Sequence, residues 1–158
     1  MPSLTQTPYT DNPVRAVLLL LCRIVLGLVL IAHGWQKFTH LGLDTVSATF
    51  AQAGVPLPQV SALVAATVEL VGGICIVFGA FTWIACTAVA LLMAGAWFFV
   101  HRGHGALVAN NGWELVGTIG AAAILLALTS AGDYSIDGIM NGPDGQSRSR
   151  RRRRRRRD

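Results

Sequence analysis

Two charged side chains interrupt apolar stretches that are otherwise long enough to cross a membrane. Arg23 lies within residues 16–35, and Glu69 lies within residues 60–79. A charge at the centre of a transmembrane helix costs about 2.5–3.5 kcal/mol on insertion scales, so such residues are rare and usually have a defined role. We therefore take Arg23 and Glu69 as a candidate intramembrane polar site.

Helix geometry predicts that these two side chains can meet. At about 1.5 Å per residue, Arg23 lies roughly 20 Å and Glu69 roughly 12 Å from the outer ends of their helices. The difference of about 8 Å is comparable to the combined reach of the two side chains, so an ion pair across adjacent helices is sterically reasonable, and whether the two residues face each other or a second protomer stays open. Such a pair is either a structural strut or a site that handles protons or a ligand, and the residues leave both interpretations open.

Small residues share helix faces with these charges. At about 100° per residue, charged and small residues fall on one side of three helices. The members are Arg23, Gly27, Leu30, Gly34 and Lys37 on the first helix, Ala62, Ala65, Ala66, Glu69, Gly72 and Gly73 on the second, and Glu114, Gly117, Thr118 and Ala121 on the last. Because small residues let helices approach closely in a membrane, we expect these faces to point inward.

A second group of polar residues maps near one membrane interface. It consists of His33, Lys37, His101, Arg102 and Glu114, with His40 and His104 nearby. This pattern predicts an outer-rim pocket for an anionic or quinone-like head group, and the alternative is ordinary headgroup contact by snorkelling side chains. The His101–His104 spacing is too common in loops to predict a metal site. The three cysteines lie singly in apolar runs, so we expect neither a metal nor a disulfide.

The elements that position these residues follow from composition. The chain has 158 residues, of which 53% are hydrophobic and 13% charged, and this argues against an ordinary soluble domain. Four apolar stretches predict membrane-spanning helices at about 16–36, 60–79, 81–100 and 113–131. The predicted fold class is all-α, an integral membrane four-helix transmembrane bundle. The first stretch is longer than the apolar region of a signal peptide and contains a charge, so we expect it to be retained.

The connections and the tail complete the predicted organisation. The loop at 36–59 has room for a short amphipathic helix near 43–51, and the second and third helices form a tight hairpin near 79–82. We divide the chain into an N-terminal cytoplasmic segment at 1–14, a membrane domain at 15–140 and a disordered arginine-rich tail at 141–158.

The net charge of +5 arises in that tail, since nine of the 13 basic residues lie in the last eleven positions. Residues 1–147 carry four basic and seven acidic side chains, so the body is weakly acidic. A polybasic segment beside a membrane first meets anionic lipid, so the lipid bilayer rather than nucleic acid is the expected partner. The tail also places both termini on the cytoplasmic side.

Several motifs, taken in order, resemble the DoxX family of small bacterial inner-membrane proteins over roughly residues 15–140. They are Arg23-(x)9-His33-Gly34-x-x-Lys37-Phe38, Ala53-Gly54-Val55-Pro56, Glu69-x-x-Gly72-Gly73 followed by Gly79 and Thr82, Asn111-Gly112-x-Glu114, and Gly132-x-x-Ser135-x-Asp137. The resemblance implies a multi-pass protein of the bacterial plasma membrane. By motif position, it carries over Arg23, His33, Lys37, Glu69 and Glu114.

The resemblance also implies a function. DoxX-like proteins include the membrane subunit of a thiosulfate:quinone oxidoreductase, so we expect a membrane subunit of a redox, quinone-linked or thiol-stress complex. A diffusible quinone is the expected cofactor, with none bound covalently, because the chain has no haem, flavin, iron–sulfur or nucleotide motif. Superoxide dismutase and a sulfurtransferase are the implied soluble partners, and a homo-oligomer stays open. The alternatives are a small-solute transporter or permeation subunit, which requires an oligomer, and a structural anchor for soluble enzymes.

Overall fold

The computed structural model describes residues 13–129, 132 and 134–141. Its helices are α1 (Pro13–Gln36), α2 (Leu43–Gln52), α3 (Pro58–Phe78), α4 (Thr82–Ala96), α5 (Glu114–Thr129) and α6 (Ile136–Asn141). Two π-helical turns, η1 (Lys37–Leu41) and η2 (Trp97–His101), extend α1 and α4, and a 3₁₀ turn, η3 (Val108–Asn110), precedes α5. The predicted segment 1–14, apart from its last two residues, and nearly all of the predicted tail at 141–158 lie outside the described residues.

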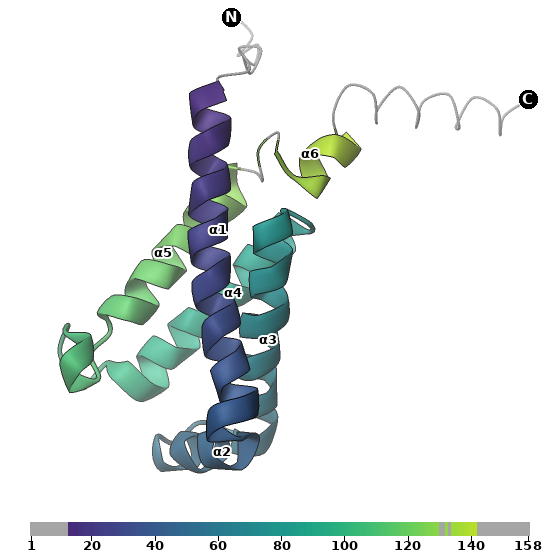
Figure 1. The fold of residues 1–158 in the computed structure, drawn as a ribbon. Helices are drawn as coiled ribbons and strands as arrows, with labels where there is room; N and C mark the ends of the chain where they lie inside the picture. The colour runs from purple at the N-terminus through teal and green to yellow at the C-terminus, as the bar shows by residue number, and fades with distance from the viewer. Residues whose placement is uncertain (1–12, 130–131, 133, 142–158) are drawn as a thin grey trace, which may run out of the picture.

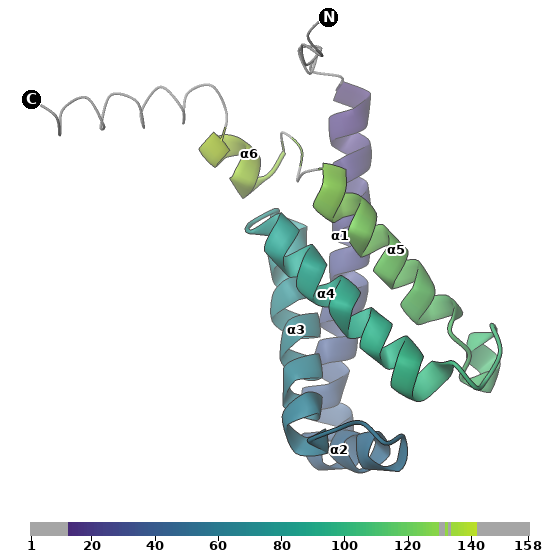
Figure 2. The same cartoon turned by 180° about the vertical axis from the view of Figure 1, so that it is seen from behind.

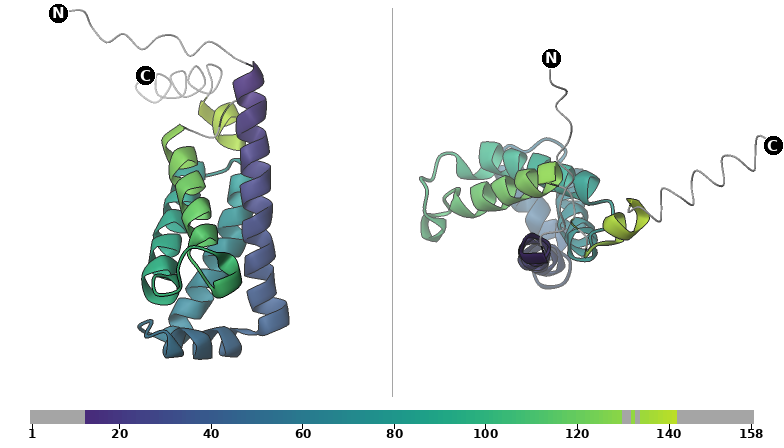
Figure 3. Two further views of the ribbon diagram at one scale, coloured as in Figure 1. Left: turned by 90° about the vertical axis from the view of Figure 1, so that its left-hand side faces the viewer. Right: turned by 90° about the horizontal axis from the view of Figure 1, so that it is seen from above.

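The four long helices alternate in direction and form two antiparallel pairs (Figure 1). Helix α1 packs along α3, and α4 packs along α5. The α4–α5 pair is inclined to the α1–α3 pair, so the pairs are close at one end and diverge at the other (Figure 2). We call the close end, with the α3–α4 turn and α6, the hairpin end, and the open end the α2 end. The side and top views in Figure 3 show the same arrangement.

Three of the four predicted spans are confirmed as helices of sufficient length and hydropathy. The spans are Pro13–Leu41, Pro58–Phe78 and Thr82–His101. The fourth apolar helix, α5, has only 16 residues, which is roughly 24 Å of helix against a hydrocarbon core of about 30 Å. The described part of the chain is therefore an all-helical bundle with three long spans and one shorter apolar helix.

Small residues bring α1 and α3 into close contact. A Cβ atom added at Gly34 would lie 2.9 Å from the Ala66 carbonyl oxygen, and one added at Gly73 would lie 2.8 Å from the Gly27 carbonyl oxygen. Such distances leave no room for a side chain, so glycine sets the spacing of the two helices. The inward face predicted for α1 is confirmed from Arg23 to Gly34, because its predicted residues in this stretch are buried. The inward face predicted for α3 is confirmed throughout, because all of its predicted residues are buried.

The inward face predicted for the last helix is wrong. Helix α5 instead buries Ile119, Gly120, Ala123 and Leu126, while Thr118 and Ala121 are exposed. The helix is apolar on all sides, so the positions of its few polar and small residues did not indicate which side packs against the bundle. The core between α1, α3, α4 and α5 contains Leu30, Ile76, Cys86, Val89 and Ala123 among its most deeply buried members.

The ends of α3 are set by local sequence. Pro58 occupies the first turn, where a missing backbone N–H costs nothing. At the other end, Gly79 has a φ of 65°, and the N–H groups of Gly79 and Ala80 donate to the carbonyl oxygens of Ile76 and Cys75. This Schellman arrangement ends the helix and starts the turn into α4, which confirms the predicted hairpin. The short helix predicted in the first loop is also confirmed, as α2.

Candidate functional site

Lys37 and Glu69 form an ion pair in the interior of the bundle, toward its α2 end. Lys37 Nζ donates to Glu69 Oε2 at 2.5 Å, and the side chains are only 18% and 8% exposed. Lys37 is the first residue of the π-helical turn that continues α1, and Glu69 lies midway along α3. Each charge neutralises the other where water is scarce, and this makes the burial of both tolerable.

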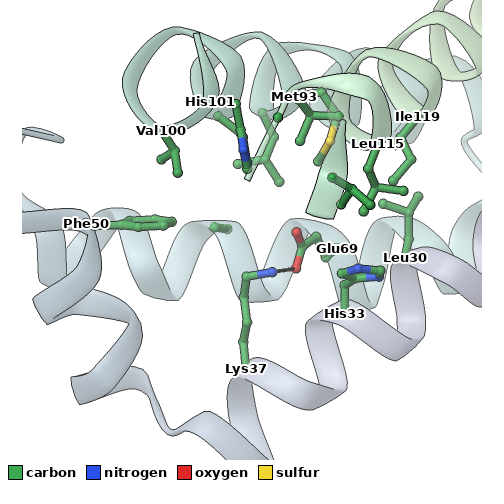
Figure 4. Close-up of a pocket in the computed structure, with 16 residues that line it drawn as sticks. Leu30, His33, Lys37, Phe50, Glu69, Met93, Val100, His101, Leu115 and Ile119 are labelled. Atoms are coloured by element: carbon green, nitrogen blue, oxygen red, sulfur yellow. Dashed lines mark hydrogen bonds and ion pairs between the residues drawn. The ribbon is translucent and has the colours of Figure 1, made fainter. Parts of the chain in front are cut away.

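This ion pair forms part of the wall of a cavity of about 230 Å³ between the two helix pairs (Figure 4). The other polar lining side chains are those of His33 and His101. Apolar residues make up most of the remaining wall: Leu30, Phe50, Leu92, Met93, Val100, Val108, Leu115, Val116 and Ile119. The cavity is therefore mostly apolar with a few convergent polar groups, a combination typical of small-molecule sites.

The two histidines occupy opposite walls of the cavity, as Figure 4 shows. His33 Nδ1 lies 2.8 Å from the carbonyl oxygen of Val29, and His101 Nδ1 lies 2.8 Å from that of Asn111. Because a carbonyl oxygen only accepts, each Nδ1 carries a proton. In the neutral ring Nε2 is then an acceptor, and in the charged ring it becomes a second donor. The Nδ1 contact thus fixes each ring, and Nε2 is left as its other polar atom.

The structure brings together only part of the predicted outer rim. His33, Lys37 and His101 line the cavity, and Glu69 from the predicted intramembrane site joins them. Arg102 does not line it, since its guanidinium carbon lies 4.5 Å from the centre of the Phe98 ring. Glu114 does not line it either, because its Oε1 accepts a hydrogen bond from the Val108 N–H at 2.7 Å. Glu114 therefore holds the loop before α5.

The predicted pairing of Arg23 with Glu69 is wrong. Arg23 is 1% exposed, and its Nε, Nη2 and Nη1 donate to the carbonyl oxygens of Ile76, Val77 and Tyr134 at 2.9–3.0 Å. Ile76 and Val77 lie seven and eight residues beyond Glu69, roughly 11 Å along α3. The estimate failed because the first helical span continues to Leu41 rather than ending near residue 35, and this shifts Arg23 toward the hairpin end.

Arg23 instead belongs to a cluster of residues that joins the α3–α4 turn to α6 and to the residue just before it. We call this cluster the hairpin clasp; it consists of Arg23, Gly79, Phe81, Thr82, Ser135 and Asp137. Asp137 donates its backbone N–H to the Gly79 carbonyl oxygen at 2.9 Å. A Cβ at Gly79 would lie 2.7 Å from the Arg23 guanidinium carbon, so the turn approaches Arg23 as closely as glycine allows.

Asp137 caps the start of α4 from outside that helix. Its two carboxylate oxygens accept the backbone N–H groups of Phe81 at 2.9 Å and Thr82 at 2.8 Å. Partial burial raises the pKa of this carboxyl group, but the hydrogen bonds from Thr82 and Phe81 and the charge of Arg23 outweigh it, so the pKa is lower than usual. Asp137 was not among the predicted site residues, although the motif Gly132-x-x-Ser135-x-Asp137 pointed to it.

The cavity also contains residues that sequence reasoning missed. Phe50 of α2 and Met93 of α4 line it, together with Leu115 and Ile119 of α5. Phe50 lies four residues after Val46, the buried residue of α2, and residues four apart share a helix face. The amphipathic spacing of this short helix could therefore have indicated that Phe50 points inward. For the uniformly apolar helices α4 and α5, the sequence offers no equivalent signal. Among the described residues, no three of His, Cys, Asp or Glu are grouped to hold a metal ion.

The fold and the cavity define a class of protein: a small helical integral membrane protein with a mostly apolar internal site. The chain matches the DoxX family model over residues 18–102. It is 30% identical over 137 residues to the inner membrane protein YphA of Escherichia coli (strain K12), covering 78% of this chain and 90% of that protein. The chain belongs to the DoxX family, and it is a multi-pass bacterial inner-membrane protein.

Two other relatives extend this comparison. An uncharacterized protein of Haemophilus influenzae (strain ATCC 51907 / DSM 11121 / KW20 / Rd) is 31% identical over 126 residues, covering 78% of this chain and 90% of that protein. A Bacillus subtilis (strain 168) protein named "Putative oxidoreductase CatD" is 36% identical over 77 residues, covering 49% of this chain and 54% of that protein. No solved structure matches the chain at a significant level.

Proposed function

We propose that this DoxX family protein is the membrane subunit of a redox complex and that its cavity binds the ring of a quinone. The observation that carries the proposal is a charge-compensated Lys37–Glu69 pair in a cavity that is otherwise almost wholly apolar. A neutral ring with two carbonyl oxygens suits such a site, because it needs hydrogen-bond donors without needing an uncompensated charge. The name of the Bacillus subtilis relative supports the same class of chemistry.

The size of the cavity supports a single ring as its occupant. An apolar cavity of about 150 Å³ is enough to admit benzene in another protein. The cavity here measures about 230 Å³, which leaves space for a substituted six-membered ring. Lys37 Nζ, and either histidine when charged, are the donors that can hydrogen-bond to a carbonyl oxygen of that ring.

Reduction of a quinone to a quinol takes up two electrons and two protons. In this proposal the two electrons come from two thiosulfate ions, which form tetrathionate through a new S–S bond as the quinone is reduced. Soluble superoxide dismutase and sulfurtransferase proteins are candidate partners of the complex. The chain itself binds and orients the ring. Of the two protons, one comes from Lys37, which Glu69 holds in place, and the other from a charged histidine, which its Nδ1 contact holds in place.

Replacement of Glu69 by Gln tests the proposal. We expect Glu69→Gln to weaken quinone binding by about tenfold, because it removes the charge that holds Lys37 and so leaves a buried cation uncompensated. Binding is measured with a benzoquinone probe on purified protein in nanodiscs. His101→Leu, at the opposite wall, is expected to weaken binding too and serves if Glu69→Gln does not fold.

The matched control is Glu114→Gln, a change of the same type outside the cavity. Its amide oxygen can still accept the Val108 N–H, so quinone affinity should stay within about twofold of the wild type. Wild-type protein that binds no quinone probe would overturn the proposal. Uptake of a small anion into sealed liposomes containing the protein would instead support the permeation alternative.

A further inference from the structure

An apolar groove adjoins the cavity on the side of α3 and α4. It measures about 370 Å³ and is lined by residues of α2, the α2–α3 loop, α3, α4 and η2. The only hydroxyl side chain in its lining is that of Ser61, which donates a hydrogen bond to the Pro56 carbonyl oxygen at 2.7 Å. The groove therefore offers hydrocarbon contacts and no unpaired polar side chain among its lining residues.

The groove lies next to the cavity. Phe50, Leu92, Ala96 and Val100 line both spaces, so they form a shared wall between them. Figure 4 places Phe50 and Val100 together at one side of the cavity, away from Leu30 and Ile119. A ligand that occupies both spaces would pass these four side chains.

The groove faces the membrane side of the bundle. Val60 of α3 is 56% exposed and Leu91 of α4 is 70% exposed, and both helices belong to apolar spans. In a bilayer these side chains meet lipid rather than water. The helix pairs diverge toward the α2 end (Figures 1 and 2), and residues of α2 and of the α2–α3 loop line the groove there.

We infer that the groove is a lateral binding site for the hydrocarbon tail of the ligand whose head lies at Lys37–Glu69. This inference rests on the proposed function and deepens it: the ligand is a tailed, lipid-soluble amphiphile that enters from the bilayer between α3 and α4. The cavity, with its few polar side chains, and the apolar groove together match a molecule with one polar ring and one apolar chain. Neither space by itself accounts for both chemistries.

Gly95 provides a place to block the groove. It lines the groove but not the cavity, and a Cβ atom added there would have no heavy atom within 4 Å. Gly95→Phe therefore fills open space without displacing the backbone. Because glycine is a poor helix former, the substitution does not weaken α4. Ala94→Phe is the matched control, because Ala94 is exposed on the same helix and lines neither space.

The experiment measures the binding of two probes to the wild type, Gly95→Phe and Ala94→Phe in nanodiscs. One probe is a benzoquinone with a ten-carbon tail, and the other is the same ring without the tail. We expect Gly95→Phe to weaken binding of the tailed probe at least tenfold and to change binding of the tailless probe less than twofold. Ala94→Phe should leave both affinities unchanged. Circular dichroism and elution volume confirm that the variants fold alike.

The outcomes separate the inference from the proposed function. If the wild type binds both probes and Gly95→Phe leaves the tailed probe unaffected, the groove does not hold the tail and the inference fails alone. If the wild type binds neither probe, the proposed function fails and takes the inference with it. If Gly95→Phe removes only a phospholipid adduct in native mass spectrometry, the groove is a lipid site and the inference is overturned.

Discussion

Charge compensation at single residues decides what kind of ligand the cavity suits. Lys37 neutralises Glu69 at 2.5 Å, so the pair contributes polarity and a hydrogen-bond donor but no net charge. The predicted rim was more basic, because Arg102 was expected to point into it, whereas its guanidinium stacks on Phe98. The site is therefore better suited to a neutral or dipolar ring than to an anion.

Arg23 acts at the residue scale as a brace. We expect Arg23→Met to lower the free energy of unfolding by roughly 3 kcal/mol, because carbonyl groups of Ile76, Val77 and Tyr134 lose charge-assisted hydrogen bonds in the interior. Unfolding in mixed SDS micelles measures this loss. Arg23→Lys should recover only part of it, since one ammonium group cannot reach three separated carbonyl oxygens.

A binding measurement on the same variants tests whether Arg23 has a direct part in ligand binding. It lies at the hairpin end, apart from the cavity lining. The affinity of folded Arg23→Met for the quinone probe should thus equal that of the wild type within about twofold. A loss of affinity at unchanged stability would contradict the assignment of Arg23 as a brace.

At the scale of elements, α6 and the residues before it stabilise the α3–α4 hairpin. Ser135 is 5% exposed; its hydroxyl donates to the Gly132 carbonyl oxygen and accepts the Gly138 N–H at 2.8 Å. This shapes the turn that presents Asp137 to the first backbone N–H groups of α4. Helix starts leave such groups unsatisfied, so Asp137 supplies from another element the cap that α4 lacks locally.

The capping role of Asp137 predicts a pH dependence. Because the pKa of Asp137 is lower in the folded state than in the unfolded state, its contribution to stability is present above the unfolded pKa of about 4 and is lost as the pH falls through the folded pKa. We expect Asp137→Asn to destabilise the protein by about 1 kcal/mol at pH 7.

The difference in unfolding free energy between the wild type and Asp137→Asn should begin to shrink as the pH is lowered from 5 to 3, because the carboxyl group of the unfolded wild-type chain takes up a proton in this range. Denaturant unfolding at a series of pH values measures it. A difference that stays constant down to pH 3 would show that the charge of Asp137 does not contribute.

At the scale of the whole molecule, two tightly packed helix pairs meet at the hairpin end and open toward α2. Close packing of α1 on α3 depends on glycines, and the hairpin clasp holds the pairs together at one end only. The cavity is lined by residues of each helix from α1 to α5 and of the short turns η1, η2 and η3.

The arrangement also predicts how the chain lies in the membrane. The start of α1 and the end of α5 lie at the same end of the bundle (Figure 1), and we propose that this end is cytoplasmic because the arginine-rich sequence follows it. A fluorescent protein fused after residue 141 should fluoresce, and alkaline phosphatase fused after residue 104 should be active. Phosphatase activity from a fusion after residue 141 would show that α5 does not cross with the other helices or that the orientation is inverted.

The sequence by itself determined the membrane class, the three long spans, and the inward faces of α3 and of α1 as far as Gly34. Long apolar stretches in lipid must satisfy their backbone hydrogen bonds internally, and small residues beside charges mark close contacts. Only the tertiary structure decided which charges meet. Lys37, not Arg23, reaches Glu69, because the axial offset of antiparallel helices depends on where the first span ends, and the π-helical turn extends it to Leu41. The apolar walls from α4 and α5 were likewise set by packing, since helices that are apolar all round do not encode which side faces inward.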